Sequence, residues 1–130
     1  MAMQSIEQQR AKAALAWAES QGKNVDSETV SAAVAMPAMI LMNGLGQTAA
    51  FYKSKKSKDP NKPSAYENLY KLLSDWLKKN VKSYANKKDL LEGITQCDAK
   101  DYRAAQVEAL AYLQWVKKFA KAYAKESDHG

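Results

Sequence analysis

The sequence predicts an all-α fold, a single-domain bundle of about five helices with a long, proline-kinked central helix. Helix-favouring residues dominate, because Ala (22), Leu (11) and Met (5) far outnumber the 12 β-branched residues. Only 5 Gly and 3 Pro are present, too few for the turns of a many-stranded sandwich. The hydrophobic content of 46% argues against global disorder, and a chain of 130 residues buries roughly 65 to 70% of its unfolded surface without disulfides. We therefore expect residues 1–130 to form one domain.

The first helix is expected at about residues 4–21. Ser5 and Gln8 have the spacing of a capping box, and Gly22 supplies a left-handed stop. Helical spacing places its apolar residues on one side, at Ile6, Ala13, Ala14 and Trp17. Arg10 lies near this apolar stripe, so its charged head either lies in water beside the core or meets a specific partner.

The second helix, capped by Asp26 or Ser27, carries no charged residue from 29 to 52. A membrane span is one alternative, but the unbroken run of apolar residues and proline covers only residues 32–42, and a spanning helix needs about 20 apolar positions. A buried central helix of a bundle is the better interpretation. No basic region precedes this stretch, as a signal peptide would require.

This central helix breaks local rules at three positions. Pro37 removes an amide donor and should kink the axis, while Gly44 and Gly46 each cost about 1 kcal/mol relative to Ala inside a helix. The segment Asn43–Gln47 is therefore either a tight helix crossing, which we favour, or a contact face for a partner. The same segment carries three methionines at helical spacing, which either pack in the core or form an adaptable interface: Met36, Met39 and Met42.

Residues 53–63 hold five lysines and two prolines and are expected to form a flexible loop. Ser64 and Glu67 then form a second capping box, which opens a helix at about residues 64–84. Its inward residues are expected to be Tyr66, Leu69, Tyr70, Leu73, Trp76, Leu77 and Tyr84, and its outward lysines Lys71, Lys78 and Lys82.

Two further helices complete the bundle. Asn86 and Asp89 frame a short helix through Leu90, Leu91 and Ile94. Asp98 caps the longest amphipathic helix, which is expected to reach about residue 125 and to leave a short mobile tail at 127–130. Its apolar face holds Tyr102, Ala105, Ala109, Tyr112, Leu113, Val116, Phe119, Ala120 and Tyr123, and the other face Arg103, Gln114, Lys117, Lys118, Lys121 and Lys125.

The net charge of +6 is concentrated in one part of the chain. Eleven lysines and only three acidic residues lie between Lys53 and Lys88, which gives this segment a charge of +8. A polyanion with regularly spaced phosphates would be attracted there, although lysine runs also serve as ordinary solubilising surface. Charge alone leaves both readings open.

Catalytic side chains are scarce. Cys97 is the one cysteine, so no intrachain disulfide or structural zinc site is expected, and a reducing cytoplasmic location fits. The one histidine, His129, is the penultimate residue and gives a histidine-based catalytic site no anchor. No Gly-rich phosphate loop or HExxH motif is present. We expect no enzyme and no cofactor; a hydrolase working with carboxylates alone is the least favoured alternative.

Three segments carry a resemblance to a known family. They are QQRAKAAL (8–15), MPAMILMNGLGQTAAFY (36–52) and YRAAQVEAL (102–110), and residues 66–77 also fit. They resemble the small α-helical subunit of the type III-B CRISPR Cmr effector complex, a similarity that extends over about four-fifths of the chain. The order of proline, Asn-Gly-Leu and Gln-Thr-Ala-Ala-Phe-Tyr within one helix is its most specific part.

The resemblance implies a non-catalytic antiviral-defence subunit, present in several copies, which lines up along backbone subunits carrying guide RNA and helps to hold target RNA. Implied partners are those subunits, further copies of the chain and the guide–target duplex, with no membrane and no small-molecule substrate. Carried over to this sequence, the RNA-binding residues would be Gln47, Lys53, Lys55, Lys56, Arg103, Lys117, Lys121 and Arg10, with a partner interface at Asn43, Gly44 and Gly46. The far end of the lysine loop, Lys58 and Lys62, is not assigned.

A hypothesis from another class also fits the sequence. The chain could be a free-standing protein-interaction bundle that docks a partner helix through its methionine stripe and the Gly44/Gly46 surface. Salt separates the two, because phosphate binding weakens steeply with salt and apolar docking does not.

Overall fold

The computed structural model describes residues 3–22 and 24–125 and confirms the all-α bundle. Within these residues there are five α-helices and one short 3₁₀-helix. Their bounds are α1 Ile6–Ser20, α2 Ser27–Ser54, α3 Ala65–Asn80, η1 Lys82–Tyr84, α4 Leu90–Gln96 and α5 Ala99–Ala122. The tail expected at residues 127–130, and with it His129, lies outside the described residues.

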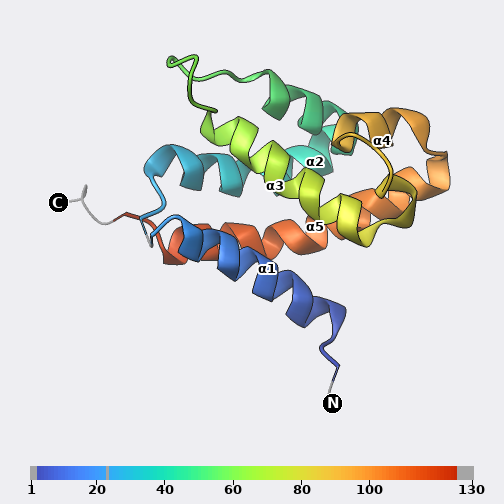
Figure 1. Cartoon of the computed structure of the whole chain (residues 1–130), viewed down its shortest axis with the longest axis horizontal. Coiled ribbons are helices and arrows are strands. Elements are labelled where there is room, and N and C mark those ends of the chain that lie inside the picture. Colours follow the sequence, from blue (N-terminus) through green and yellow to red (C-terminus); the bar gives the residue numbers. More distant parts are fainter. Residues whose placement is uncertain (1–2, 23, 126–130) are drawn as a thin grey trace.

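Helix α2 runs through the middle of the bundle and packs against α3, α4 and α5, whereas α1 packs on α5 (Figure 1). The first turns of α1 extend past the other helices in this view. Ile6, which the spacing places on the apolar side, is consequently 43% exposed, so its expected inward position is wrong. Ala14 is fully buried as expected.

The predicted helix starts are confirmed by their hydrogen bonds. Ser5 and Ser64 each form a complete capping box, with Gln8 and Glu67 respectively. Asp side chains cap the other three α-helices, and Asp26 rather than Ser27 caps α2. Gly22 follows the end of α1 with φ of +69°, which is the left-handed stop expected there.

Two helices end earlier than expected. Helix α3 stops at Asn80, and the chain continues through the 3₁₀-turn η1, which still buries Tyr84. Helix α5 ends at Ala122 rather than near residue 125. The reason is a main-chain pairing, in which Val25 N donates to Tyr123 O at 2.9 Å and Lys125 N donates to Val25 O at 2.8 Å. These bonds tie the α1–α2 linker to the end of α5.

The break in α2 lies at Gly44 and not at Pro37. Gly44 has φ of 88° and ψ of 161°, while the helix continues through Pro37, so the kink expected at the proline is not confirmed. A positive φ of this size is open to glycine and strained for most other residues. Gly44 therefore divides α2 into two helical halves of different direction.

Methionines on the first half of α2 differ in burial. Met36 is fully buried, Met39 is partly buried against the core and Met42 is 81% exposed. The stripe therefore contributes to the core at its start and to the surface at its end.

Helix α2 is long and apolar enough to cross a membrane, and no other described helix meets that test. Core helices of soluble bundles meet it too. Ten of its residues, Ile40 and Tyr52 among them, are buried against neighbouring helices, and the Tyr52 hydroxyl donates to the Ala32 carbonyl at 2.6 Å. This packing is typical of a central core helix, the interpretation favoured from the sequence.

Candidate nucleic-acid interface

The lysines at the end of α2 lie over aromatic rings. The ammonium of Lys53 is 5.1 Å from the centre of the Tyr70 ring, and that of Lys55 is 5.4 Å from Phe51 and 5.7 Å from Tyr66. Both lysines are exposed. Such cation–π contacts hold the side chains in place and leave part of each ammonium open to solvent.

The loop after α2 has a defined set of hydrogen bonds. Ser57 Oγ donates to the carbonyls of Asp59 and Lys62 at 2.6 Å each, Asn61 N donates to the Asp59 carboxylate at 2.9 Å, and Ser64 Oγ donates to the Lys55 carbonyl. These contacts fold the loop back on itself between α2 and α3, while the flexibility expected of residues 53–63 stays a prediction. The loop thereby holds its lysines beside the first turns of α3.

Three surface hollows meet around this loop and along α3. Their volumes are about 360, 560 and 570 Å³, and they share lining residues, since the first two both include Pro63 and Glu67 and the last two both include Lys56 and Lys58. We call these three adjoining hollows together the lysine furrow. The lysines that line it are Lys53, Lys55, Lys56, Lys58, Lys62, Lys71, Lys78 and Lys88.

The carboxylates that line the furrow already have partners in the fold. Glu67 pairs with Lys56 at 2.9 Å and Asp75 with Lys71 at 3.1 Å. A hydrogen bond from the Ser64 amide, helped by Lys56, lowers the pKa of Glu67 below its usual range. The other three accept backbone amide hydrogens: Glu28 from Ala65, Asp59 from Asn61 and Asp89 from Glu92. Six of the eight furrow lysines therefore have no ion pair within the described residues.

The predicted residues of α5 lie apart from the furrow. Arg103 and Lys121 are exposed and Lys117 is half-buried, and none of them lines the three hollows. They share one side of α5, and about 27 Å of helix separates Arg103 from Lys121 at about 1.5 Å per residue. In Figure 1 the loop lies at the top and α5 along the lower part of the bundle. The structure therefore does not gather the predicted lysines and arginines into one site.

Gln47 is exposed on the second half of α2, directly after the helix break. The preceding Gly46 amide donates to the hydroxyl of Tyr102 at 2.8 Å, so this part of α2 crosses α5 next to Arg103. The crossing thus brings Gln47 and Arg103 into the same region of the molecule and leaves the furrow lysines elsewhere.

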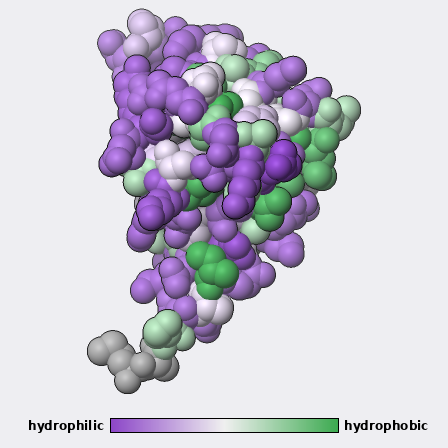
Figure 2. All heavy atoms as spheres, turned by 90° about the vertical axis from the view of Figure 1, so that its right-hand side faces the viewer, coloured by the Kyte–Doolittle hydropathy of each residue, from purple (hydrophilic) through white to green (hydrophobic). Residues whose placement is uncertain are grey.

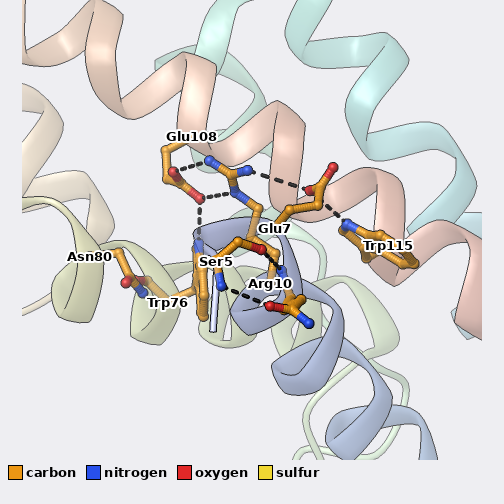
Figure 3. Close-up of polar contacts among 8 residues, drawn as sticks. Ser5, Glu7, Arg10, Trp76, Asn80, Glu108 and Trp115 are labelled. Carbon is orange, nitrogen blue, oxygen red and sulfur yellow. Dashed lines mark hydrogen bonds and ion pairs between the residues drawn. The ribbon is translucent and has the colours of Figure 1, made fainter. Parts of the chain in front are cut away.

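Arg10 is engaged inside the protein. Its Nε and Nη2 each lie 2.7 Å from an oxygen of Glu108, and its Nη1 lies 3.4 Å from Glu7 (Figure 3). Two indoles complete the network, since Trp76 Nε1 donates to Glu108 and Trp115 Nε1 to Glu7, each at 2.9 Å. The network joins α1 to α5 and α3. Because the guanidinium fork is occupied, an RNA contact by Arg10 stays a prediction that would require these bonds to open.

The same contacts shift the pKa values of the network. Hydrogen bonding to Glu108 raises the pKa of Arg10. Burial alone would raise the pKa of Glu108, but the bonds from Arg10 and Trp76 outweigh it and leave this pKa lowered. The bond from Trp115 is the main cause of the lowered pKa of Glu7. All three groups are thus held in their charged forms.

The tight crossing expected at the glycines of α2 is present. A Cβ on Gly44 would lie 3.3 Å from the Tyr102 hydroxyl, and a Cβ on Gly46 3.3 Å from Ile94. An interface with another protein at Asn43, Gly44 and Gly46 stays a prediction, and of the three only Asn43 is exposed. Next to the break, Leu41 is 71% and Met42 81% exposed. Figure 2 shows the end of the molecule near α4 as mostly hydrophilic, with hydrophobic side chains gathered along one edge.

Sequence reasoning missed part of the furrow. The family resemblance assigns neither Lys58 nor Lys62, and the sequence pattern does not single out Lys71, Lys78 or Lys88, although all five line the furrow with Lys53. The seven-residue spacing of Lys71 and Lys78 on one side of α3 was the available signal. In the described part of the chain no group of three His, Cys, Asp or Glu side chains could hold a metal ion.

One comparison with known proteins bears on these surfaces. The model of a family described as CRISPR-associated protein (Cas_Cmr5) matches residues 6–123. The match runs from the start of α1 to the cap of α5 and so includes the furrow, the α2 break and the Arg10 network.

Proposed function

This chain belongs to the CRISPR-associated Cmr5 family, and from that membership we propose that it is a non-catalytic subunit that helps to assemble a type III-B Cmr ribonucleoprotein and to hold target RNA along the guide RNA. The family itself indicates a subunit of the Cmr complex. The proposed partners are the backbone subunits, further copies of the chain and the guide–target duplex, in the cytoplasm. Neither a cofactor nor a small-molecule substrate is part of the proposal.

The observation that carries the RNA-holding role is the set of exposed cations without ion pairs at the end of α2. Lys53 and Lys55 are held over aromatic rings and have no ion pair within the described residues, and Lys56, which is paired with Glu67, adjoins them. Lysines attract phosphates without reading bases, which suits a subunit whose complex obtains its sequence specificity from base pairing. Gln47 and the α5 residues Arg103, Lys117 and Lys121 form the second part of the proposed surface. Arg10 is assigned to holding α1 in place.

Binding by a single copy is expected to be weak. Several copies in a row raise the effective local concentration of phosphate-binding groups, so a modest affinity per copy becomes sufficient in the assembly. The proposed function is therefore a property of the assembled complex, and the test belongs there.

The test measures target-RNA affinity of the assembled complex with lysines reversed. The variant Lys53→Glu/Lys55→Glu/Lys56→Glu is expected to weaken binding at least tenfold at about 0.1 M salt, because three phosphate contacts become repulsive. The variant Arg103→Glu/Lys117→Glu/Lys121→Glu probes the second surface. Lys12→Glu/Lys79→Glu/Lys82→Glu, three exposed lysines outside both surfaces, is the matched control. Unchanged affinity in both site variants, with the complex fully assembled, would reject the RNA-holding role.

A free-standing interaction bundle remains the competing function, favoured by one observation, the exposed Leu41 and Met42 within the uncharged residues 29–52 of α2. Docking of a partner at Gly44 and Gly46 is less favoured, because Tyr102 already fills the space beside these two glycines. Isolation of the chain from its cell with a single protein partner and no RNA would favour this function.

A further inference from the structure

We infer, on the basis of the proposed function, that the lysine furrow is a track for the phosphate backbone of a single, unpaired RNA strand. The track would run from Lys88 and Lys78, along the exposed side of α3, and around the 55–63 loop to Lys55. It includes Lys58 and Lys62, which the family resemblance did not assign.

Continuity is the first argument. The three hollows share lining residues in sequence, Pro63 and Glu67 between the first pair and Lys56, Ser57 and Lys58 between the second. The three hollows therefore adjoin one another along α3 and the loop, as binding sites for successive phosphates of one strand would. Lys71 and Lys78, about 10 Å apart along α3, place cations at intervals along its middle part.

Charge is the second argument. The eight furrow lysines outnumber the five furrow carboxylates, two of which are already paired with Lys56 and Lys71, so the furrow keeps an excess of positive charge. Six lysines are left for an external anion: Lys53, Lys55, Lys58, Lys62, Lys78 and Lys88. Lys78 donates to the Lys88 carbonyl at 3.4 Å, a long contact that an incoming phosphate could replace.

Shape decides between a single strand and a duplex. Three adjoining hollows of about 360 to 570 Å³ along α3 and the loop fit one flexible sugar-phosphate chain. The A-form duplex of RNA is a stiffer rod with a deep, narrow major groove, and it follows such a line of small hollows less closely than a single strand does. Lysine contacts to phosphates carry no base information, so the contact is expected to be independent of sequence.

The first experiment measures binding of the full chain to a labelled 20-nucleotide oligouridylate and to a 20-base-pair RNA duplex by fluorescence anisotropy. The variant Lys58→Gln/Lys62→Gln/Lys88→Gln removes three exposed furrow lysines, and Lys12→Gln/Lys79→Gln/Lys82→Gln removes the same charge outside the furrow and outside the proposed α5 surface. Each phosphate contact adds about 0.7 to the slope of log affinity against log salt concentration. The loss of three contacts should therefore weaken binding of the single strand by the furrow variant about a hundredfold at 0.1 M salt. The control should stay within about threefold, a change that reflects net charge alone.

Three results would overturn the inference: no binding of the single strand by the unmodified chain at 50 mM salt, tighter binding of the duplex, or an equal loss in the control. The same variants in the assembled complex separate this inference from the proposed function. If the α5 variant lowers target-RNA affinity and the furrow variant does not, the furrow inference fails and the RNA-holding function stands. If neither does, and the variant Lys53→Glu/Lys55→Glu/Lys56→Glu is without effect as well, both fail. Circular dichroism of each variant confirms that the bundle is folded.

Discussion

At the scale of single residues, one arginine shows how a charged side chain can look like a ligand-binding group in the sequence and be structural in the fold. Arg10 is half-buried, and its bidentate pair with Glu108 uses the geometry that would otherwise bind a phosphate. Glu108 is 98 positions away from Arg10, so no local sequence pattern predicts the pair. Arg10 is thus a clamp between α1 and α5.

The clamp makes a prediction about acid stability. Replacing Glu108 by Gln should lower the free energy of unfolding by about 2 kcal/mol at pH 7, between the values for exposed and fully buried pairs. The pKa of Glu108 is lowered in the folded state, so the stabilisation is present above its unfolded pKa of about 4.5 and is lost as the pH falls through the folded value. Urea unfolding at pH 7 and at several lower pH values should show the difference between wild type and variant shrink as the pH falls below about 4.5.

A matched control for this measurement is Glu19→Gln, which alters an exposed carboxylate on α1, the helix that carries Arg10. It should change the unfolding free energy by less than about 0.5 kcal/mol at any of these pH values. If the Glu108 variant were as destabilised at pH 3 as at pH 7, the contribution of Glu108 would be one of packing and not of charge.

At the scale of helices, side chains of α5 stabilise the break in α2. After Gly44 the second half of α2 begins anew, and its first amides need acceptors. Gln106 Oε1 accepts from Leu45 N and the Tyr102 hydroxyl from Gly46 N, both at 2.8 Å. Side chains of α5 therefore cap the second half of α2 and fix the angle between its two halves.

This cap predicts the effect of removing one oxygen atom. Tyr102→Phe keeps the ring but leaves the Gly46 amide without an acceptor, which should cost about 1 to 3 kcal/mol of unfolding free energy. Amide hydrogen exchange should accelerate at Leu45 and Gly46 more than elsewhere in α2. Tyr66→Phe is the matched control, because the Tyr66 hydroxyl makes no hydrogen bond within the described residues. An equal loss of stability in both variants would contradict the capping role.

The helices were predictable because their signals are local. Ser5 with Gln8 and Ser64 with Glu67 are three residues apart, and the structure contains both capping boxes. The break in α2 was assigned to Pro37 because proline removes an amide, but the deciding contacts come from Tyr102 and Gln106, 56 and 61 positions away. Ile6 is exposed although its spacing matches the apolar side of α1, since periodicity does not tell which turns of a helix a neighbour will cover.

At the scale of the whole molecule, charge and apolar surface are separated. The segment from Lys53 to Lys88 carries +8, whereas residues 29–52 of α2 carry no charge. The sequence was sufficient to locate the lysine-rich segment, but the furrow depends on how the loop folds against α3, and the spread of Arg103, Lys117 and Lys121 along α5 required the packing of the bundle. Two chemically different surfaces on one small subunit suit one partner held by phosphate contacts and another by apolar contacts.

That separation predicts different responses to salt in the assembled complex. Raising salt from about 50 to 500 mM should release RNA held through lysines, because counterions compete with phosphate contacts, but should leave apolar contacts between subunits intact. Leu41→Gln/Met42→Gln should lower retention of the subunit at high salt at least tenfold, since each buried apolar side chain contributes about 1.5 to 3 kcal/mol. Co-purification with a tagged neighbouring subunit, at both salt concentrations, measures this retention.

The control is Ile6→Gln, which removes an exposed apolar side chain on α1 and should leave retention unchanged. Because Leu41 and Met42 are exposed, their replacement should not lower the thermal midpoint of the isolated chain, so a loss of retention would report on assembly and not on folding. If salt alone released the wild-type subunit together with the RNA, RNA would be the bridge that holds the subunit in place. Leu41 and Met42 would then have no part in assembly, and the lysine surfaces would both bind RNA and hold the subunit in the complex.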